Sequence, residues 1–441
     1  TLFIDRETAS DLRSVLDRIF IHKFWGYVIF FVVLMITFQS IFDWSSTPQD
    51  FIDNTFVSLS ELVKSKLPDG VFTSLLSEGI IPGLAGIVIF IPQIAFLFLF
   101  ISIMEETGYM SRVVFLMDRG LRRFGLNGKS VIPLISGTAC AIPAVMATRN
   151  IENWKERLIT ILVTPFTTCS ARLPVYAILI ALVIPQGSFL GLSYQGLMLM
   201  FLYLIGFGMA LISAWILSKT LKIKSKSYFV VEMPNYKLPL FKNIGITVWG
   251  KTKSFVTEAG KIILAISIIL WVLASNGPGE NFSNAEQIIK TNNTELDKEI
   301  LTNKINSFKL EHSYIGILGK SIEPIISPLG YDWKIGIALI SSFAAREVFV
   351  GTLATIYSVG SNAEETIKNQ MASEVKSDGK PLFNLASGIS LMLFYAFAMQ
   401  CMSTLAIVKK ETNSWKWPLI QLLSMSLLAY FIAFSTYQIL A

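Results

Sequence analysis

The sequence predicts an all-α integral membrane protein with several crossings, and three observations carry this prediction. Hydrophobic residues make up 53% of the 441 residues and charged residues only 15%, whereas soluble domains carry about a quarter charged residues. The apolar residues form runs that match the length of roughly 20 residues that a membrane-crossing helix needs. The chain has a formal net charge of +6, and its basic residues lie in the polar stretches between these runs. Composition therefore excludes a soluble fold, and the charge indicates membrane orientation rather than nucleic-acid binding.

The apolar runs differ in how well they suit an unbroken helix. The clearest candidate spans are Phe24 to Phe42, Pro82 to Met104, Leu158 to Ile184, Tyr194 to Leu217, Lys261 to Ala274, Ile335 to Tyr357, Leu385 to Val408 and Trp417 to Leu440. A shorter run, Val131 to Ala147, contains Pro133, Gly137, Cys140 and Pro143. Proline and glycine interrupt helices, so this run is predicted to be broken.

Two basic loops predict how the short run lies. Residues 105–130 and 218–261 are rich in Lys and Arg, and short loops of this kind stay in the cytoplasm. Residues 158–217 make one crossing out and one back, so both flanks of Val131 to Ala147 are cytoplasmic. The run is therefore predicted to be re-entrant, which is tolerated only where protein or a polar cavity surrounds it.

The second half allows two topologies. If Ile335 to Tyr357 is also re-entrant, the two halves form an inverted repeat, as in many transporters with a site at the midplane. If it crosses fully, both termini are cytoplasmic. The sequence leaves both open, with about seven or eight crossings in total.

The chain divides into six predicted segments. They are a cytoplasmic juxtamembrane segment (1–23), a first transmembrane helix (24–43), an external amphipathic linker (44–81), a first repeat (82–217), a basic cytoplasmic linker (218–256) and a second repeat (257–441) with an external loop at 276–332.

The three cysteines are the first candidates for chemistry. Cys140, Cys169 and Cys401 are an odd number and lie in apolar segments, so no disulfide framework is indicated. Each stands beside Ser, Thr, Gly or Pro, where a broken helix frees backbone carbonyls, and thiolate with oxygen ligands suits Fe²⁺ or Zn²⁺. The alternative is that each cysteine is a small packing residue. The residues leave these two interpretations evenly matched.

Further polar groups lie at or near membrane depth, where they are costly unless they face a cavity or a partner. Glu347 and Glu106 are candidate metal contacts, and the candidate pathway or gating residues are Glu105, Ser136, Thr138, Pro143, Thr168, Ser170, Arg172, Arg346, Gln400 and Met402. The alternatives are an interfacial role for Glu105 and Glu106 beside arginines, and a structural ion pair for Arg346 and Glu347. Asp118 and Arg122 are expected to be a surface i,i+4 pair.

No enzyme activity is expected from this chain. The two histidines, His22 and His312, lie outside the apolar runs, which excludes a histidine metal cluster in the membrane. Gly128-Lys129-Ser130 lacks the first glycine of a phosphate-binding loop, because Arg123 occupies that position. No nucleotide-binding residue is therefore assigned.

Several strings resemble one family closely. They are M-E-E-T-G-Y-M-S-R at 104–112, F-L-M-D-R at 115–119, G-K-S-V-I-P-L at 128–134, S-G-T-A-C-A-I-P-A-V-M-A-T-R at 136–149, C-S-A-R-L-P-V-Y at 169–176, A-R-E-V-F-V-G at 345–351 and Q-C-M at 400–402. From about Arg18 to the C-terminus, the chain resembles the membrane domain of ferrous iron transport protein B.

The resemblance implies a permease for Fe²⁺ with two gate-like repeats, in which Cys140, Cys169 and Cys401 match the family's motif cysteines. Fe²⁺ is then the transported substrate, with no permanently bound cofactor. Family members normally carry an N-terminal GTP-binding domain and a helical spacer, which this sequence lacks, so truncation or a separate chain is expected.

The resemblance also implies that the protein lies in a bacterial cytoplasmic membrane and that small cytoplasmic accessory proteins of the iron system are its partners. Assembly into a homo-oligomer is compatible with the resemblance. Two other functions stay open. One is transport of another divalent metal or of a nucleoside-related solute, and the other is a membrane scaffold or receptor that transports nothing.

Overall fold

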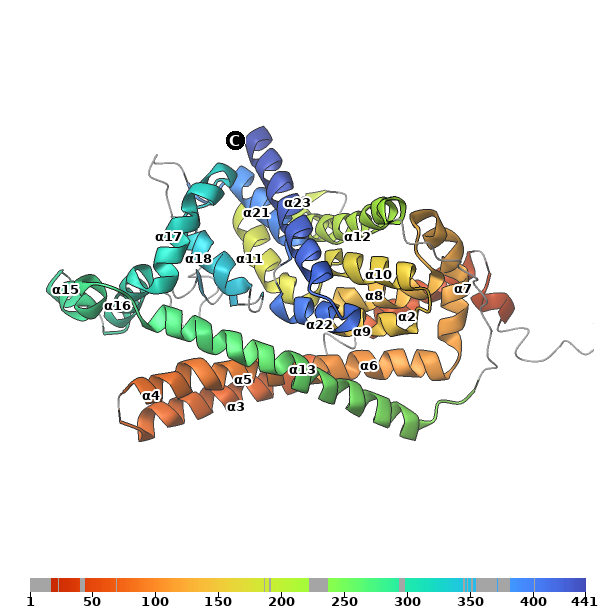
Figure 1. The fold of residues 1–441 in the computed structure, drawn as a ribbon, viewed down its shortest axis with the longest axis horizontal. Helices are drawn as coiled ribbons and strands as arrows, with labels where there is room; N and C mark the ends of the chain where they lie inside the picture. Colours follow the sequence, from red (N-terminus) through yellow and green to blue (C-terminus); the bar gives the residue numbers. More distant parts are fainter. Residues whose placement is uncertain are drawn as a thin grey trace, which may run out of the picture. The chain divides into compact units, whose positions relative to one another are not determined.

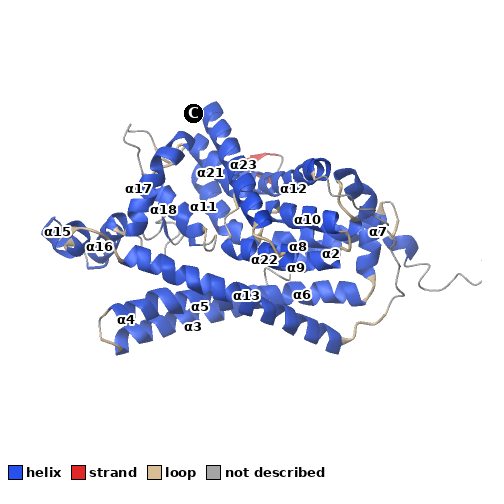
Figure 2. Cartoon of the chain, viewed as in Figure 1, coloured by secondary structure: helices blue, strands red, loops and turns tan. Residues whose placement is uncertain are grey.

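The computed structural model describes residues 17–22, 24–39, 44–68, 70–185, 187–189, 192–221, 237–292, 298–343, 346, 348–349, 352–353, 371, 381–399 and 401–441. The described residues are mainly helical, as predicted (Figures 1 and 2). One small exception is the antiparallel ladder of β1 (Ser188–Phe189) and β2 (Leu192–Ser193), where Ser188 pairs with Ser193 and Phe189 with Leu192.

The elements up to residue 220 include several very short helices. They are α2 (Trp25–Gln39), α3 (Ser45–Lys66), α4 (Val71–Ser74), the π-helical η3 (Leu75–Ile80), α5 (Ile81–Val88), α6 (Phe90–Glu106), α7 (Tyr109–Leu121), η4 (Arg122–Phe124), η5 (Gly128–Ser130), α8 (Val131–Ala139), α9 (Ala141–Ala147), η6 (Thr148–Asn150), α10 (Trp154–Val163), η7 (Thr164–Phe166), η8 (Ser170–Arg172), α11 (Leu173–Val183) and α12 (Tyr194–Thr220).

The elements after residue 240 begin with the longest helix described. They are α13 (Phe241–Ser275), α14 (Glu280–Ser283), α15 (Ala285–Asn292), α16 (Lys298–His312), α17 (Tyr314–Ile326), η9 (Ser327–Leu329), α18 (Trp333–Ser342), α21 (Leu385–Phe397), α22 (Met402–Thr412) and α23 (Lys416–Leu440). Several helices begin at a side-chain cap that satisfies a free backbone N–H, for example Asp332 at α18 and Asn384 at α21.

The chain forms two compact units, each built from three stretches of sequence. Unit 1 consists of Thr1–Ser58, Ala85–Thr167 and Met209–Gly260, and unit 2 of Leu59–Leu84, Thr168–Gly208 and Lys261–Ala441. Cys140 belongs to unit 1, whereas Cys169 and Cys401 belong to unit 2.

Unit 1 is organised around the short helices that follow α6. Helix α7 contacts α2, α6 and η5, and α8 contacts α9 and η7. The chain turns by 86° between α6 and α7. Gly108 makes this turn with φ 78°, a left-handed conformation that glycine adopts without strain.

Unit 2 is organised around α21. This helix packs against α23 and α11, and α17 packs against α18. Ser390 of α21 is central, because its hydroxyl bonds to the carbonyl of Ala433 in α23 at 3.0 Å and to the hydroxyl of Tyr331 at 2.9 Å. These buried bonds join three parts of unit 2 that are distant in sequence.

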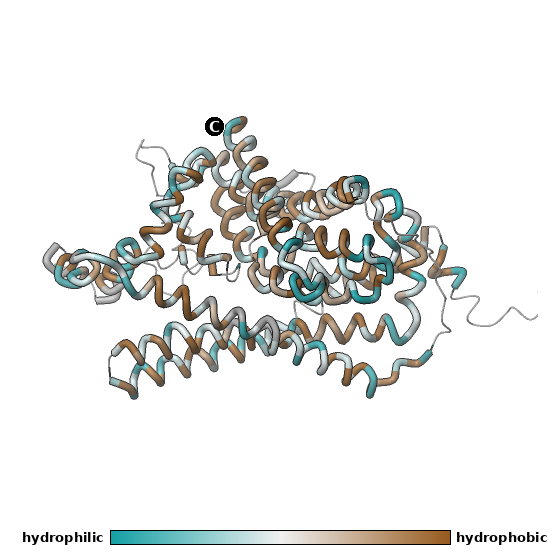
Figure 3. The backbone as a smooth tube through the Cα atoms, in the orientation of Figure 1, coloured by the Kyte–Doolittle hydropathy of each residue, from teal (hydrophilic) through white to brown (hydrophobic). Residues whose placement is uncertain are grey.

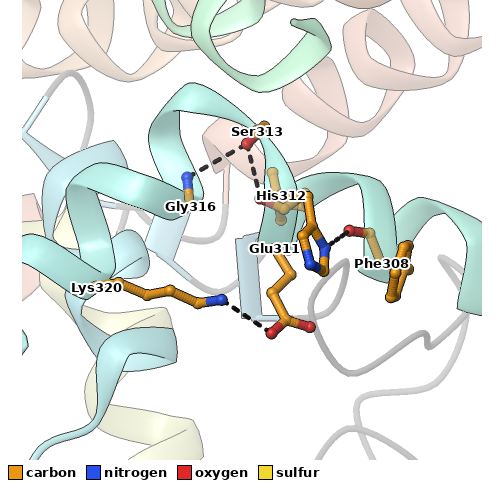
Figure 4. A network of polar contacts seen from close by, with 7 residues as sticks. Phe308, Glu311, His312, Ser313, Gly316 and Lys320 are labelled. Carbon is orange, nitrogen blue, oxygen red and sulfur yellow. Dashed lines mark hydrogen bonds and ion pairs between the residues drawn. The ribbon is translucent and has the colours of Figure 1, made fainter. Parts of the chain in front are cut away.

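A polar corner joins α16 to α17 in unit 2 (Figure 4). The Ser313 hydroxyl accepts a hydrogen bond from the N–H of Gly316 and so caps α17. The ring of His312 packs on that of Phe308 with 4.3 Å between centroids, and Lys320 pairs with Glu311 at 3.1 Å. This corner lies in the predicted external loop, and its residues are mostly hydrophilic or half exposed (Figure 3).

Four helical stretches in the described residues are long and apolar enough to cross a membrane. They are Trp154–Val183, Tyr194–Thr220, Leu385–Thr412 and Lys416–Leu440, with a fifth if the bent pair Ile91–Glu106 and Tyr109–Asp118 counts as one span. Figure 3 shows hydrophobic residues along helices such as α12 and α23.

This number is smaller than the seven or eight crossings expected, for identifiable reasons. The described part of the first predicted span is α2, which has 15 residues, because residues 40–42 lie outside the described part. Pro82 to Met104 divides into α5 and α6. Most of Ile335 to Tyr357 after Ser342 lies outside the described residues. The predicted segment Lys261 to Ala274 is part of α13, whose 35 residues extend for about 50 Å.

Candidate functional site in the broken helices

The run Val131 to Ala147 is broken at Cys140, as predicted. Cys140 has an extended backbone, with φ −156° and ψ 131°, between the last residue of α8 and the first of α9. The helices α8 and α9 pack against each other, and Figure 1 draws them side by side. The N–H of Cys140 donates to the carbonyl of Ser136 at 3.0 Å, and its carbonyl accepts from the N–H of Ala144 at 3.4 Å, so the backbone of Cys140 links the two helices.

Gly137 lets α8 approach the next interruption in unit 1. A Cβ atom at Gly137 would lie 2.3 Å from Oγ1 of Thr167 and 3.1 Å from Cγ2 of Thr164. Ser136 and Pro143 are buried, whereas Thr138 and Cys140 are partly exposed. The hydroxyl of Thr138 donates to the carbonyl of Ile135 at 2.6 Å, and that of Thr167 donates to the carbonyl of Thr164 at 2.7 Å.

The second interruption lies in the middle of the candidate span Trp154–Val183. Thr167 and Cys169 have extended backbones, between the short turns η7 and η8. Pro165 in η7 and Pro174 at the start of α11 lack the N–H that would continue a helix. The interruption places Cys169 and Ser170 in partly exposed positions.

Thr168 and Arg172 anchor this interruption within unit 2. The Thr168 hydroxyl donates to the carbonyl of Leu202 in α12 at 3.5 Å, and the N–H of Arg172 donates to the carbonyl of Cys169 at 3.1 Å. The Arg172 side chain is fully buried. A fully buried charge in a span is costly, which marks Arg172 as part of a polar region inside the protein.

The third interruption divides the candidate span Leu385–Thr412. Helix α21 ends at Phe397, and α22 begins at Met402 after the extended residue Cys401. Arg346 donates from Nη2 to the carbonyl of Ala398 at 3.4 Å, and the N–H of Met402 donates to the carbonyl of Phe343 at 3.2 Å. The chain after α18 therefore satisfies backbone groups that this break leaves open.

Unit 2 brings Cys169 and Cys401 into one region. Cys401 lies beside Arg346 and Thr404 and within electrostatic range of Cys169. Cys169 in turn lies within electrostatic range of Tyr176 of α11 and Tyr203 of α12. The two cysteines, both partly exposed, therefore belong to one polar cluster, although they are far apart in the sequence.

Buried hydroxyl groups surround these cysteines. The oxygens of Tyr176, Tyr395, Ser403 and Thr404 are buried and make no hydrogen bond of ordinary geometry to the described part of the chain. The polar side chains beside the two phenols are Thr168 and Ser342. Buried polar atoms are nearly always satisfied in folded proteins, and Thr168 and Ser342 are the neighbours placed to satisfy the two phenols.

The candidate acidic residues are placed differently. Glu105 and Glu106 end α6 in unit 1, where a carboxylate oxygen of Glu106 accepts from the amide of Asn243 at 3.3 Å. Glu347 and Gln400 lie outside the described residues. Among the described side chains, no group of three or more His, Cys, Asp and Glu residues could hold a metal ion. An ion bound at the helix breaks that carry the cysteines would therefore need hydroxyl and carbonyl oxygens as ligands in addition to the thiols.

Asp118 differs from its expected role as a surface partner of Arg122. The ion pair is present, but Asp118 is buried at 9% exposure and also accepts a hydrogen bond from the N–H of Gly128 at 3.0 Å. The pair and the exposed position of Arg122 are as expected, but the surface position of Asp118 was wrong, because i,i+4 spacing shows only that two residues share a helix face. It cannot show that another segment covers that face.

The sequence also missed the phenols of the unit 2 cluster. Tyr176 ends the string C-S-A-R-L-P-V-Y, and Tyr395 lies six residues before Cys401. A tyrosine in an apolar run has a polar atom that needs a partner. That signal was present in the sequence, but only the fold places these two tyrosines beside the breaks.

Two family descriptions match the chain. The family Gate, described as "Nucleoside recognition", matches residues 87–183 and 256–415. "Ferrous iron transport protein B C terminus" matches residues 199–251. The two parts of the Gate match contain all three interruptions described above.

Curated relatives give the same result. The chain is 44% identical over 428 residues to the "Fe(2+) transporter FeoB" of Leptospira interrogans serovar Lai, covering 97% of this chain and 59% of the relative. It is 35% identical over 441 residues to the "Fe(2+) transporter FeoB" of Staphylococcus aureus MSSA476, covering 98% and 60%.

A third relative is a fusion. The chain is 34% identical over 443 residues to the "Fe(2+) transport protein A/Fe(2+) transporter FeoB fusion protein" of Porphyromonas gingivalis, covering 97% of this chain and 51% of that protein. The chain thus spans between half and three-fifths of these relatives' length. No solved structure matches it. The chain belongs to the ferrous iron transport protein B family, of which it carries the Gate-containing membrane region.

Proposed function

We propose that this region conducts Fe²⁺ across a bacterial cytoplasmic membrane, into the cytoplasm, through the interrupted helices. The observation that carries the proposal is the polar cluster of unit 2, where Cys169 and Cys401 lie at breaks in two candidate spans. Transport proteins commonly bind substrate where discontinuous helices meet near the midplane. Fe²⁺ accepts both thiolate and oxygen ligands, which this cluster offers.

Cys140 is proposed as a third contact on the same pathway. It occupies a break of the same kind in unit 1, next to Ser136, Thr138 and Pro143. The packing of α8 against α9 supports a re-entrant hairpin at this position. Glu105 and Glu106, at the end of α6, are proposed to collect cations near one mouth of the pathway.

Weak coordination suits a transported ion. An ion that is conducted must bind well enough to enter and loosely enough to leave. The described acidic, histidine and cysteine side chains form no three-residue metal site, and the partly exposed thiols stand among neutral hydroxyls. Arg172 and Arg346 add positive charge to unit 2, which we propose limits how long a divalent cation remains there.

The resemblance to the family supports two further proposals about the intact protein. A GTP-binding domain would regulate the pathway, and small accessory proteins of the iron system would bind on the cytoplasmic side. The second is supported by the Porphyromonas gingivalis relative, whose name joins Fe(2+) transport protein A to the transporter.

A nucleoside-related solute is the second candidate, because the matching Gate family is described as "Nucleoside recognition". Three aromatic residues do lie in unit 2 near the breaks, namely Tyr176, Tyr395 and Phe349. They are at most 1% exposed, and the rings of Phe349 and Tyr395 pack edge to face at 4.9 Å. Covered rings offer no face on which a base could stack, which favours the metal.

Uptake of radioactive Fe²⁺ into proteoliposomes that contain the complete protein tests the proposal. We expect Mn²⁺ or Co²⁺ in excess to reduce the uptake and nucleosides to leave it unchanged, because the cluster offers sulfur and oxygen ligands. Empty liposomes are the control. Inhibition by a nucleoside would support the second candidate, and the absence of any metal flux would support a scaffold that transports nothing.

A further inference from the structure

Helix α7 of unit 1 is held at its first turn by a buried ion pair. The side chain of Arg112 is fully buried, and its Nε lies 3.0 Å from Oδ1 of Asp17. Nη1 of Arg112 also donates to the carbonyl of Gly108 at 2.9 Å. Gly108 is the residue that turns the chain between α6 and α7, so one guanidinium joins this bend to the segment around Asp17.

Two residues that come after Asp17 in the sequence, Phe20 and Tyr27, make further contacts with α7. The ring of Phe20 packs edge to face on Tyr109 with 5.3 Å between centroids. The hydroxyl of Tyr27 donates to the carbonyl of Leu116 at 3.3 Å. These contacts run from the first residue of α7 to Leu116 in its middle, so a displacement of the segment is resisted along this part of the helix.

The far end of α7 holds the turn that leads into α8. Oδ1 of Asp118 accepts from the N–H of Gly128, the first residue of η5. A Cβ atom at Gly128 would lie 2.4 Å from the carbonyl oxygen of Val114, so this approach requires glycine. The turn ends at Ser130, whose hydroxyl lies 2.8 Å from that of Thr160 in α10.

Only α8 separates this turn from Cys140. The helix runs from Val131 to Ala139 without interruption, and helices move largely as rigid elements. A shift of η5 is therefore carried along α8 to the Cys140 break. The chain of contacts is Asp17 to Arg112, α7, Asp118 to Gly128, α8 and then Cys140.

A small apolar cavity adjoins α7. It has a volume of about 30 Å³ and is lined by residues of α2, α6, α7 and α8, including Phe30, Leu97, Met104, Met110, Ile135 and Ser136. Protein interiors contain few such voids. Met104 and Met110 lie on either side of the 86° bend, and methionine adapts its shape more readily than branched side chains. The cavity and the two methionines leave room for side chains beside α7 to adjust when the helix shifts.

We infer that α7 is a positioning element that couples the segment around Asp17 to the Cys140 break. Asp17, Arg112 and Asp118 are its positioning residues. Arg112 and Asp17 are expected to move together because separating them would break a charge-assisted hydrogen bond of a fully buried guanidinium. The inference rests on the proposed function for its importance to transport, since it assumes that Cys140 lies on the pathway. The mechanical coupling itself is testable without iron.

The test measures how fast a methanethiosulfonate reagent labels Cys140 in the complete protein, in membranes, with every other cysteine changed to serine. Asp118→Ala removes the bond to Gly128, and Asp17→Asn removes the charge that faces Arg112. Because charge-assisted hydrogen bonds are among the strong ones, we expect either change to alter the labelling rate by about tenfold. Asp118→Asn should change the rate less than Asp118→Ala, because its amide oxygen can still accept from Gly128 although the ion pair with Arg122 is lost.

Two controls separate positioning from a general loss of structure. The same variants are made in a protein that keeps Cys401 alone, whose labelling should stay constant because Cys401 belongs to unit 2 and lies at the break between α21 and α22. Glu152→Gln alters an exposed ion pair with Lys129 and should leave Cys140 unaffected. An unchanged Cys140 rate in both variants, or an equal change at Cys140 and Cys401, would overturn the inference. Neither outcome depends on whether the protein transports iron.

Discussion

Changing both Cys169 and Cys401 to serine in the complete protein should reduce Fe²⁺ uptake by about 10- to 100-fold. Groups that only support metal ligands affect metal affinity by about that factor, so loss of two direct contacts should cost at least as much. Serine keeps the size of the side chain but lacks the softer sulfur that Fe²⁺ accepts. Initial uptake rates in iron-starved cells, normalised to the amount of protein in the membrane, provide the measurement.

The single changes show whether the two thiols act together. The effects of substitutions at residues that share one partner are not additive. Each single substitution should therefore cause most of the loss of uptake seen in the double variant. Cys140→Ser provides the comparison from unit 1. Iron-edge anomalous scattering from iron-soaked crystals should place density near the sulfurs of Cys169 and Cys401. Full uptake by the double variant would remove these thiols from the mechanism, and density at Glu105 or Glu106 alone would move the site to the entrance.

Gly388→Ala should destabilise the protein by about 1–3 kcal/mol, the usual cost of overpacking a tight interface. A Cβ atom at Gly388 would lie 2.2 Å from Cγ2 of Val183, 2.8 Å from its Cγ1 and 2.9 Å from its Cβ. Valine is stiff at χ1 and cannot turn all three atoms away. Helices α11 and α21, which carry the segments next to Cys169 and Cys401, must therefore separate. Thermal unfolding of the purified protein in detergent measures the effect.

The chain supplies matched variants for this prediction. Gly208→Ala adds the same methyl group in α12, where no atom lies within 4 Å of the new Cβ, and should leave the unfolding temperature unchanged or slightly higher. Combining Val183→Ala with Gly388→Ala restores the space and should recover most of the loss. If Gly388→Ala behaves like Gly208→Ala, α11 and α21 do not approach as closely as described.

The breaks themselves could be predicted from the sequence, because their causes are local. Pro133, Gly137 and Pro143 surround Cys140, and Pro165 and Pro174 surround Cys169. Proline lacks the N–H of a helical hydrogen bond wherever it stands in the fold. Hydrophobicity is equally local, so the spans at Tyr194 to Leu217 and Trp417 to Leu440 were found within a few residues of α12 and α23.

The limits of the broken spans were less predictable. The apolar run from Pro82 to Met104 was predicted to form one helix. In the structure, Ile89 separates α5 from α6, and Gly108 then turns the chain. Pro92, in the first turn of α6, has no N–H to bond to the carbonyl of Val88, so the sequence did contain a local cause of that interruption. Trp154, Lys155 and Glu156 extend α10 before the predicted start, because capping by Asn153 outweighs their polarity.

The sequence by itself determined that this is a membrane protein of many helices, that three of its interruptions carry a cysteine, and that its strings resemble one transporter family. Only the tertiary structure decided which interruptions meet. It placed Cys169 with Cys401 in unit 2 and Cys140 in unit 1, and it paired Arg112 with Asp17 across 95 residues. Helix breaks and hydrophobicity depend on neighbouring residues, whereas these pairings depend on how distant segments pack, which no local pattern encodes.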